Sequence, residues 1–184
     1  MFGVSDKMIL HDLPRDRVTP EKFTAVIEIP KGSKVKYEID EDTGLLALDR
    51  ILSTSVQYPW NYGYIPRTHA FDGDPLDILL ICSETLLPNT LVECKPIGLL
   101  KMIDGGDQDD KVICVATKDR FFNMFDSVKQ LPQHVSDEIM HFFSVYKTLE
   151  GKVTKADEMQ DADAAKEMVK VCMEMYDKEF PDMP

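Results

Sequence analysis

Three aspartates crowd the entrance to an apolar, strand-like run in the stretch AFDGDPLDILLIC, residues 70–82. They lie within six positions and are Asp72, Asp74 and Asp77. Four more lie within seven positions of the stretch KMIDGGDQDDKV, residues 101–112: Asp104, Asp107, Asp109 and Asp110. Carboxylates repel one another and strands are depleted in Asp, so this crowding needs compensation. Because clustered oxygen ligands suit a hard cation such as Mg²⁺, Mn²⁺ or Ca²⁺, the two groups predict a divalent-metal site.

Two other sites built on the first group are disfavoured. An EF-hand loop starting at Asp72 needs Gly at its sixth position and Glu at its twelfth, where Asp77 and Ser83 stand. A phosphatase with a D-x-D nucleophile usually carries its strand before the aspartate pair. Here the clear strand follows the pair.

Basic and phenolic side chains accompany the carboxylates along the chain. They are Lys36, Arg50, Tyr58, Tyr62, Tyr64, Arg67, Lys111, Tyr146 and Lys147. Such donors among carboxylates describe a site for a metal plus phosphate. From the residues alone, plainer roles stay open, because Lys36 and Glu38 also fit a solvated strand face and Tyr146 also fits a core position. Trp60 and Tyr64 are expected to pack.

Composition narrows the class of protein. The chain has 184 residues, a net charge of −12 and a sequence pI near 4.7, which make nucleic acid and anionic membranes poor partners. The cysteines form no C-x-x-C pair and lie mostly in apolar runs, so we expect reduced core thiols and a cytoplasmic protein. Charged residues interrupt residues 1–14, which therefore lack a signal-peptide core, and no apolar run is long enough to span a membrane.

Most of the chain has the pattern of short strands, followed by two helices. We predict strands at 23–30, 34–40, 45–50, 76–82, 90–102 and 111–116, with a turn at 42–44 and a loop rich in Pro and Gly at 57–67. Helical spacing predicts helices at 136–151, where Gly151 follows Leu149 as a stop, and at 161–180. The fold class is α+β, mainly β, in one domain spanning residues 1–184, and close turns favour a barrel or sandwich.

The stretch DGDPLDI, residues 72–78, resembles the signature of the family I soluble inorganic pyrophosphatases. Further segments are similar to that family in its order and spacing: VIEIPKGSKVKYEIDEDTGLLALDR at 26–50, YPWNYGYIP at 58–66, KPIGLLKMID at 95–104 and HFFSVYK at 141–147. The resemblance covers residues 12–150 and is weak over 151–184. The short chain resembles the bacterial type of the family.

The resemblance implies a five-stranded OB-like barrel with two C-terminal helices packed on it, Mg²⁺-dependent hydrolysis of pyrophosphate, and a homohexamer. It places the metal ligands on Asp72, Asp77, Asp104 and Asp109. The residue that helps generate the attacking hydroxide falls on Asp74. Substrate contacts fall on Lys36, Arg50, Tyr62, Lys111, Tyr146 and Lys147. Further active-site positions are Glu28, Glu38 and Tyr58.

These assignments imply a mechanism in which several Mg²⁺ ions, or Mn²⁺, cancel the charge of pyrophosphate and acidify a bound water. Asp77 is the expected carboxylate bridge between two cations. Asp74 is expected to accept the proton or orient the nucleophile. Lys36, Arg50 and the tyrosines are expected to position the phosphate groups.

Two alternatives are kept. An OB-like module that grips nucleic acid needs a basic groove with stacking aromatics, whereas the barrel-forming segments here are acidic. A degenerate, non-catalytic family member finds support only at Gly105, where the family commonly has Glu. Gly105 removes one carboxylate near the metals, which bears on the weaker metal sites and not on the reaction class. The preferred metal and activity on longer polyphosphates stay open.

Overall fold

A computed structural model of the chain describes residues 9–40 and 43–183. The expectation for residues 1–14 and the turn predicted at 42–44 lie partly outside these residues. Within them, no helix combines the length and apolar character needed to cross a bilayer.

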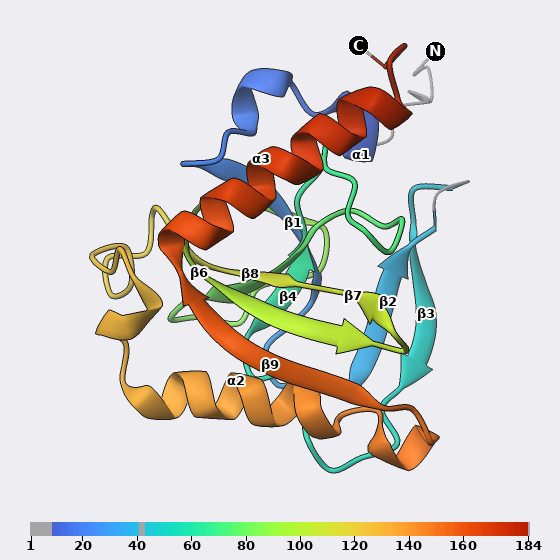
Figure 1. Ribbon diagram of the computed structural model, residues 1–184, viewed down its shortest axis with the longest axis vertical. Helices are drawn as coiled ribbons and strands as arrows, with labels where there is room; N and C mark the ends of the chain where they lie inside the picture. Colours follow the sequence, from blue (N-terminus) through green and yellow to red (C-terminus); the bar gives the residue numbers. More distant parts are fainter. Residues whose placement is uncertain (1–8, 41–42, 184) are drawn as a thin grey trace.

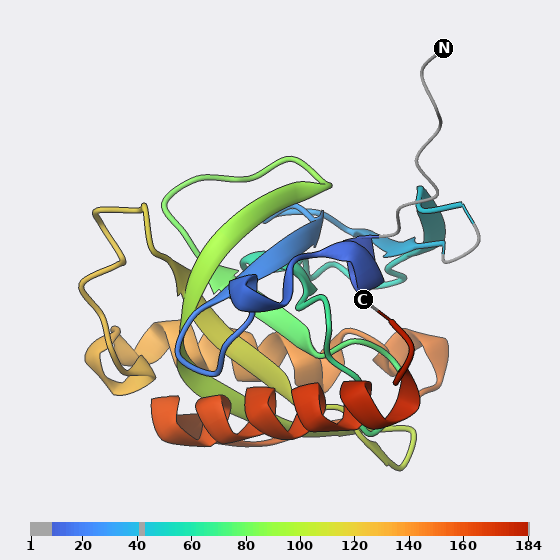
Figure 2. The ribbon, with the colours of Figure 1, turned by 90° about the horizontal axis from the view of Figure 1, so that it is seen from above.

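Five strands form a closed ring at the centre of the molecule (Figure 1). In ring order they are β1 (Phe23–Ile29), β4 (Asn61–Tyr64), β5 (Asp77–Ile81), β8 (Lys111–Ala116) and β6 (Thr90–Asp104), and β6 pairs back onto β1. All these pairs are antiparallel except β5–β8, which is parallel. Figure 2 shows the strong curvature of β6, which allows it to pair with both β8 and β1 in the ring. The predicted five-stranded, mainly β architecture is confirmed as a ring.

The strand β4 lies inside the stretch 57–67, which the sequence predicts to be a loop, so that prediction is wrong there. Gly63 in its centre approaches β1 so closely that a Cβ on it would lie 1.8 Å from the main-chain oxygen of Val26. Only glycine permits this contact, and the same glycine gives the segment the composition of a loop. A strand of four residues is also too short to show an alternating pattern.

Four further strands lie outside the ring. The hairpin of β2 (Val35–Ile39) and β3 (Leu46–Ile51) forms a separate two-stranded sheet, which confirms the predicted strand pair. Two strands that the sequence did not predict pair with β6: β7 (Asp107–Gln108) and β9 (Thr154–Asp161). The strand β9 is polar and pairs along one edge only, and none of its residues is fully buried. Its sequence therefore lacks the apolar pattern by which a strand is recognised.

The two predicted helices are present. They are α2 (Gln133–Val145) and α3 (Ala162–Glu179), and the shorter helical segments are α1 (Ile9–Asp12), η1 (Arg15–Arg17), η2 (Val128–Gln130) and η3 (Thr148–Glu150). The predicted end of α2 is wrong, because the α-helix stops before Tyr146 and a 3₁₀ turn follows. Leu149, which lies inside the predicted helix 136–151, is outside the observed α-helix and is 71% exposed. Gly151 ends the 3₁₀ turn in the left-handed conformation, with φ +71°.

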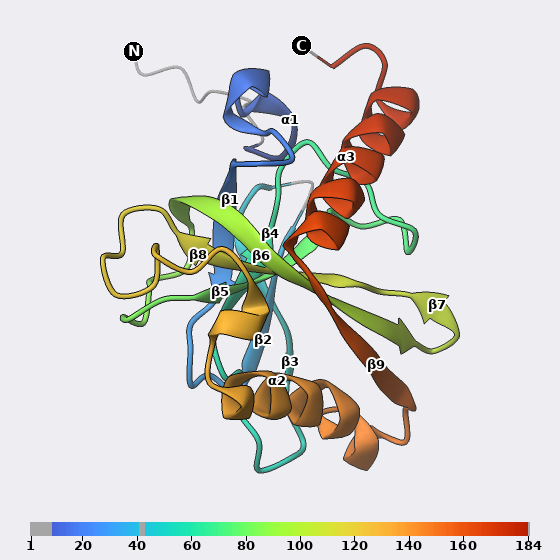
Figure 3. The ribbon, with the colours of Figure 1, turned by 60° about the vertical axis from the view of Figure 1, so that its left-hand side comes forward.

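The ring strands contribute side chains to two hydrophobic clusters, because successive side chains of a strand point to opposite faces. Along β5, Ile78 and Leu80 enter one cluster, whereas Leu79 and Ile81 enter the other. The helix α3 contributes to the first cluster and α2 to the second, and Figure 3 shows the two helices on different sides of the strands with β9 running between them. This packing confirms the prediction that two C-terminal helices pack on the β-structure.

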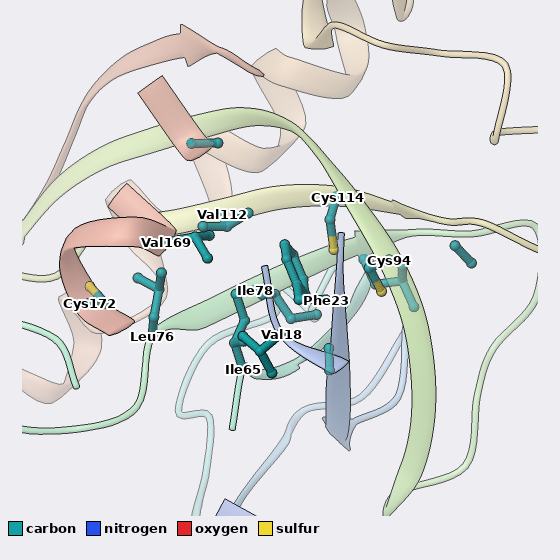
Figure 4. Close-up of a cluster of buried hydrophobic side chains, with 14 of the residues drawn as sticks. Val18, Phe23, Ile65, Leu76, Ile78, Cys94, Val112, Cys114, Val169 and Cys172 are labelled. Carbon is teal, nitrogen blue, oxygen red and sulfur yellow. The ribbon is translucent and has the colours of Figure 1, made fainter. Parts of the chain in front are cut away.

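All four cysteines are buried and unpaired, as the sequence predicts: Cys82, Cys94, Cys114 and Cys172. They belong to the first cluster, where Cys172 comes from α3 and Cys94 and Cys114 come from neighbouring strands (Figure 4). Burial raises the pKa of the Cys114 thiol well above its usual value, so the thiol is a packing group.

Candidate active site

The parallel pairing of β5 with β8 brings the two aspartate groups together. Ile78 lies opposite Val112 in this pair, so the two strands begin at the same edge of the sheet. Residues 72–76 precede β5 and Asp77 begins it, and residues 104–110 precede β8. Groups that are more than 25 positions apart in the sequence therefore meet at one end of the ring.

A tight turn shapes the first group. Gly73 has φ +94°, and the amide of Asp74 donates to the Asp72 carboxylate at 3.1 Å. The buried hydroxyl of Thr68 accepts from the amide of Leu76 at 2.8 Å and closes the base of the loop. The segment is therefore a turn and does not present the three carboxylates in the alternating manner of a strand.

One pocket, of about 140 Å³, collects six of the predicted site residues. These are Glu28, Lys36, Glu38, Tyr62, Asp74 and Asp77. The remaining lining comes from Leu10, Tyr37, Ile39, Tyr64 and Pro75. Tyr64 packs against Leu10 and Val26 as expected, and it also lines the pocket.

Glu28 enters this pocket at an irregularity of β1, where the pairing with β4 shifts register between Ile27 and Ile29. Its carboxylate accepts from the amide of Ile39 at 3.1 Å, which ties β1 to the β2–β3 hairpin. Burial, with the charge of Asp77 adding to it, raises the pKa of Glu28 to about 8. The side chain is thus a buried carboxyl group held close to the aspartates.

Lys111 joins the two aspartate groups directly. Its ammonium group bonds to the carboxylates of Asp77 and Asp109, and its side chain is only 2% exposed. Burial alone lowers the pKa of this lysine, but the charges of Asp77 and Asp109 outweigh it and the pKa is raised. Tyr62 donates its hydroxyl to Asp77 as well. One carboxylate from each group therefore faces the same buried cation.

The end of α2 supplies a second cluster around Asp104. The ammonium group of Lys147 bonds to Asp104, and the Tyr146 hydroxyl lies 3.4 Å from the same carboxylate. Burial and then the charge of Asp104 raise the pKa of Tyr146, and Asp77 and Asp109 act in the same direction. Tyr146 is therefore a buried core residue that also lies within electrostatic reach of both aspartate groups.

Arg50 carries two carboxylate neighbours that the sequence did not single out. Asp49 lies 2.6 Å from one terminal nitrogen of the guanidinium group, and Glu150 lies 3.2 Å from its Nε. Asp49 precedes Arg50 in the sequence, so this neighbour could have been recognised from the sequence. Glu150 lies on η3, and only the fold brings it near Arg50. Tyr58 is buried beside this region, with its ring 5.3 Å from that of Tyr62.

Comparison with known proteins places this geometry in a family. The model of the inorganic pyrophosphatase family matches residues 25–177. The chain belongs to the inorganic pyrophosphatase family. It is therefore an inorganic diphosphatase, which hydrolyses pyrophosphate, and the expected reaction class is confirmed. The match also runs through residue 177, well beyond the segment 12–150 in which motifs can be recognised by eye.

Relatives of known name cover almost the whole chain. Soluble inorganic pyrophosphatase 2 of Chlamydomonas reinhardtii is 45% identical over 170 residues, which are 92% of this chain and 88% of the relative. The inorganic pyrophosphatase of Halalkalibacterium halodurans is 46% identical over 159 residues, 86% of this chain and 98% of the relative. The crystal structure of inorganic pyrophosphatase from Thermus thermophilus has a TM-score of 0.87 at 42% identity, covering 91% of this chain and 98% of that one. This coverage confirms the similarity to the short, bacterial-type pyrophosphatases.

Gly105, where the family commonly has Glu, has a local structural explanation. Gly105 and Gly106 form the two-residue connection of the β6–β7 hairpin, whose flanking residues Asp104 and Asp107 pair. Their φ angles are +61° and +107°. Positive φ at both central residues favours glycine, so this pyrophosphatase has a tight hairpin turn where the family commonly places a carboxylate.

The donor set of this pyrophosphatase fits a hard divalent cation. Burial, with the charges of Asp109 and Asp77 adding to it, raises the pKa of Asp72 to about 6, so these carboxylates crowd one another. Within residues 9–40 and 43–183, no three carboxylate, imidazole or thiol groups form a ready metal cage. Instead, lysine ammonium groups stand among oxygen donors of the kind Mg²⁺ prefers.

Proposed function

We propose that this chain hydrolyses inorganic pyrophosphate to two phosphates with the help of Mg²⁺, and that the two aspartate groups form one catalytic centre. The observation that carries the proposal is the contact of Lys111 with Asp77 from the first group and Asp109 from the second. Family membership supports the reaction, and this contact supports its proposed location.

Four carboxylates would hold the metal: Asp72, Asp77, Asp104 and Asp109. Asp77 is the best candidate for a bridging ligand because it stands between the pocket and the second group. When bound, Mg²⁺ supplies charge neutralisation of the substrate and a water of lowered pKa, with Mn²⁺ as the alternative ion. The turn at Gly105 should affect the weaker metal sites first, because it replaces a carboxylate of the family pattern.

The chain's own residues then bind the substrate and move a proton. Asp74, which lines the pocket, accepts the proton of the attacking water or orients it. The cationic and phenolic groups that hold the phosphates are Lys36, Arg50, Tyr62, Lys111, Tyr146 and Lys147. The positive charges of the lysines and the arginine, and the hydroxyl donors of the tyrosines, stabilise the charge that develops on the leaving phosphate. Glu28 and Glu38 line the same pocket, and Tyr58 supports the site by packing its ring beside that of Tyr62.

The decisive experiment compares the Asn variants of the first aspartate group by Mg²⁺ titration and turnover. Asp72→Asn and Asp77→Asn should weaken Mg²⁺ binding and be partly rescued by more Mg²⁺. Asp74→Asn should keep Mg²⁺ affinity and lose roughly 10²- to 10⁴-fold in turnover, the usual contribution of a positioned general base. If Asp74→Asn behaves like the other two, Asp74 is a ligand and the assignment of the base is wrong.

A phosphate-release assay on the wild-type chain tests the whole proposal. Activity should appear with pyrophosphate and Mg²⁺ and disappear in excess EDTA. Full activity in EDTA would refute the metal requirement. Inactivity with every divalent ion would favour the degenerate family member instead.

We also propose a cytoplasmic homohexamer. Four buried, unpaired cysteines support a reducing compartment. Leu149 and Val153 expose 71% and 81% of their surface between α2 and β9, in the last third of the chain where we expect subunit contacts. Light scattering that gives a monomer mass at micromolar concentration, at both low and physiological salt, would reject the hexamer.

A further inference from the structure

Asp107 and Asp110 of the second group have no role in the proposed chemistry, although Asp110 is the most deeply buried aspartate of that group. Asp110 has a side chain that is 3% exposed, whereas Asp107 of the same group is exposed. Asp110 lies between Asp109, a proposed metal ligand, and Lys111, which contacts both aspartate groups. Its burial beside the site therefore calls for a role of its own.

Three donors satisfy the Asp110 carboxylate. The amide of Met102 on β6 donates to it at 3.0 Å, and the side-chain amide of Gln108 donates at 2.7 Å. The ammonium group of Lys101 forms an ion pair with it. A buried carboxylate with a main-chain donor, a side-chain donor and a counter-ion is fully compensated and held in one orientation.

These contacts replace main-chain pairing where the ladder between β6 and β8 stops. The last pair of that ladder is Leu100 with Lys111, and β7 begins to pair only at Ile103. Between these points Met102 accepts from the amide of Asp109 at 3.0 Å and donates to the side chain of Asp110. Asp110 thus stands in for a backbone acceptor and ties residues 109–111 to β6.

The orientation of the neighbouring residues follows from this tie. Successive side chains of an extended segment point to opposite sides. While Asp110 is bound to Met102 and Lys101, Asp109 bonds to Lys111, and Lys111 also bonds to Asp77. Without the anchor, residues 109–110 would have one main-chain hydrogen bond to β6 left to resist rotation.

We propose that Asp110 is a positioning residue: it touches neither metal nor substrate, but it orients Asp109 and Lys111 and thereby strengthens the binding of the divalent cation. The inference rests on the proposed function, in which Asp109 is a ligand. Loss of such a supporting residue typically costs roughly 10- to 100-fold in metal affinity or activity.

The test uses the full chain as Asp110→Ala, Asp110→Asn and the control Asp107→Asn. Mg²⁺ affinity is measured by calorimetry without substrate, and the protection of the Met102 amide is measured by hydrogen exchange. Asp110→Ala should lose Met102 protection and bind Mg²⁺ roughly 10- to 100-fold more weakly. Asp110→Asn keeps one oxygen acceptor for Met102, so its loss should be smaller. Asp107→Asn, exposed on the same hairpin, should match the wild type.

The outcomes separate this inference from the proposed function. Wild-type Mg²⁺ affinity in Asp110→Ala, even with a lowered melting temperature, would overturn the positioning role. If Asp110→Ala does not fold, Asp110→Asn decides: weaker Mg²⁺ binding at intact fold supports the role, and unchanged binding refutes it. Failure of the proposed function would appear in the wild type, as a chain without Mg²⁺ binding or hydrolysis.

Discussion

The ammonium group of Lys111 is hydrogen-bonded to the carboxylate of Asp109, and both side chains are largely buried, at 2% and 13% exposure. Asp77 shares the same ammonium group. This contact makes one lysine the counter-charge for carboxylates that come from two distant parts of the chain. Under the proposed function, in which Asp77 and Asp109 hold the metal, protein stability and metal binding are coupled at this contact, and the coupling can be measured.

Lys111→Met should strongly destabilise the metal-free protein. Removing one partner of a buried ion pair costs about 3–5 kcal/mol, because the remaining charges stay buried without compensation. Urea unfolding in EDTA should show this loss, and added Mg²⁺ should restore part of it by replacing the missing charge. The control Lys155→Met removes an exposed pair with Asp157 and should change stability by less than about 1 kcal/mol. Equal stability of wild type and Lys111→Met in EDTA would contradict the argument.

Glu28→Gln should change the pH dependence of stability. Burial, followed by the charge of Asp77, raises the pKa of Glu28 from 4.5 to about 8, so the folded state holds the proton more tightly than the unfolded state. The free energy of unfolding should therefore fall as pH rises from about 4.5 to 8. Gln cannot ionise, so the variant should gain stability relative to the wild type by pH 8.

The measurement is guanidinium unfolding in EDTA at several pH values, since a bound cation would hold Glu28 ionised. The variant and the wild type should differ least near pH 5. Parallel pH profiles for the two proteins would show that the carboxyl group is not perturbed in the folded state.

Gly63→Ala should be among the most damaging changes in the ring. The new Cβ would lie 1.8 Å from the main-chain oxygen of Val26, so β1 and β4 would have to separate. Gly98→Ala is a matched comparison, because its Cβ would lie 2.9 Å from Cβ and Cγ1 of Val128 and 3.0 Å from the main-chain oxygen of Gln160. These overlaps are smaller and fall partly on a side chain, so thermal unfolding should rank Gly63→Ala as clearly worse. Val128→Gly removes both of the Val128 atoms and should partly relieve the Gly98 variant, and equal damage at the two glycines would argue against the close strand contact.

Asp161→Ala should weaken the start of α3. The Asp161 carboxylate caps the helix by accepting from the Ala162 amide at 2.9 Å, and losing such a cap costs about 1 kcal/mol. Hydrogen bonds from Ser127, Lys129 and Ala162 lower the pKa of Asp161 to about 2. A lowered carboxyl pKa stabilises at neutral pH, and this contribution should fade as pH falls from about 4 towards 2.

Asp161→Asn separates the two effects in urea unfolding. It keeps the capping oxygen, so it should retain more stability than Asp161→Ala at pH 7, but it should not share the acid dependence. Equal stability of Asp161→Asn and Asp161→Ala at pH 7 would show that the capping hydrogen bond does not stabilise α3.

The sequence by itself determined the chemistry of this protein. Carboxylates at Asp72, Asp74 and Asp77, with lysines, an arginine and tyrosines in family order, identified the inorganic pyrophosphatase family before any coordinates. Strong local periodicity also located β1, β2, β8 and the start of α3 within a residue or two. These features can be recognised from the sequence because they depend only on residue type and short-range spacing.

Only the tertiary structure decided which of these residues meet and what each of them faces. The parallel pairing of β5 with β8 brings Asp77 to Lys111, and no local pattern encodes that partner choice. Asp109 and Asp110 are the same residue type one position apart, yet one faces Lys111 and the other the amide of Met102. Which side of the strand a carboxylate occupies depends on pairing register across the sheet, and that register is set by contacts between distant segments.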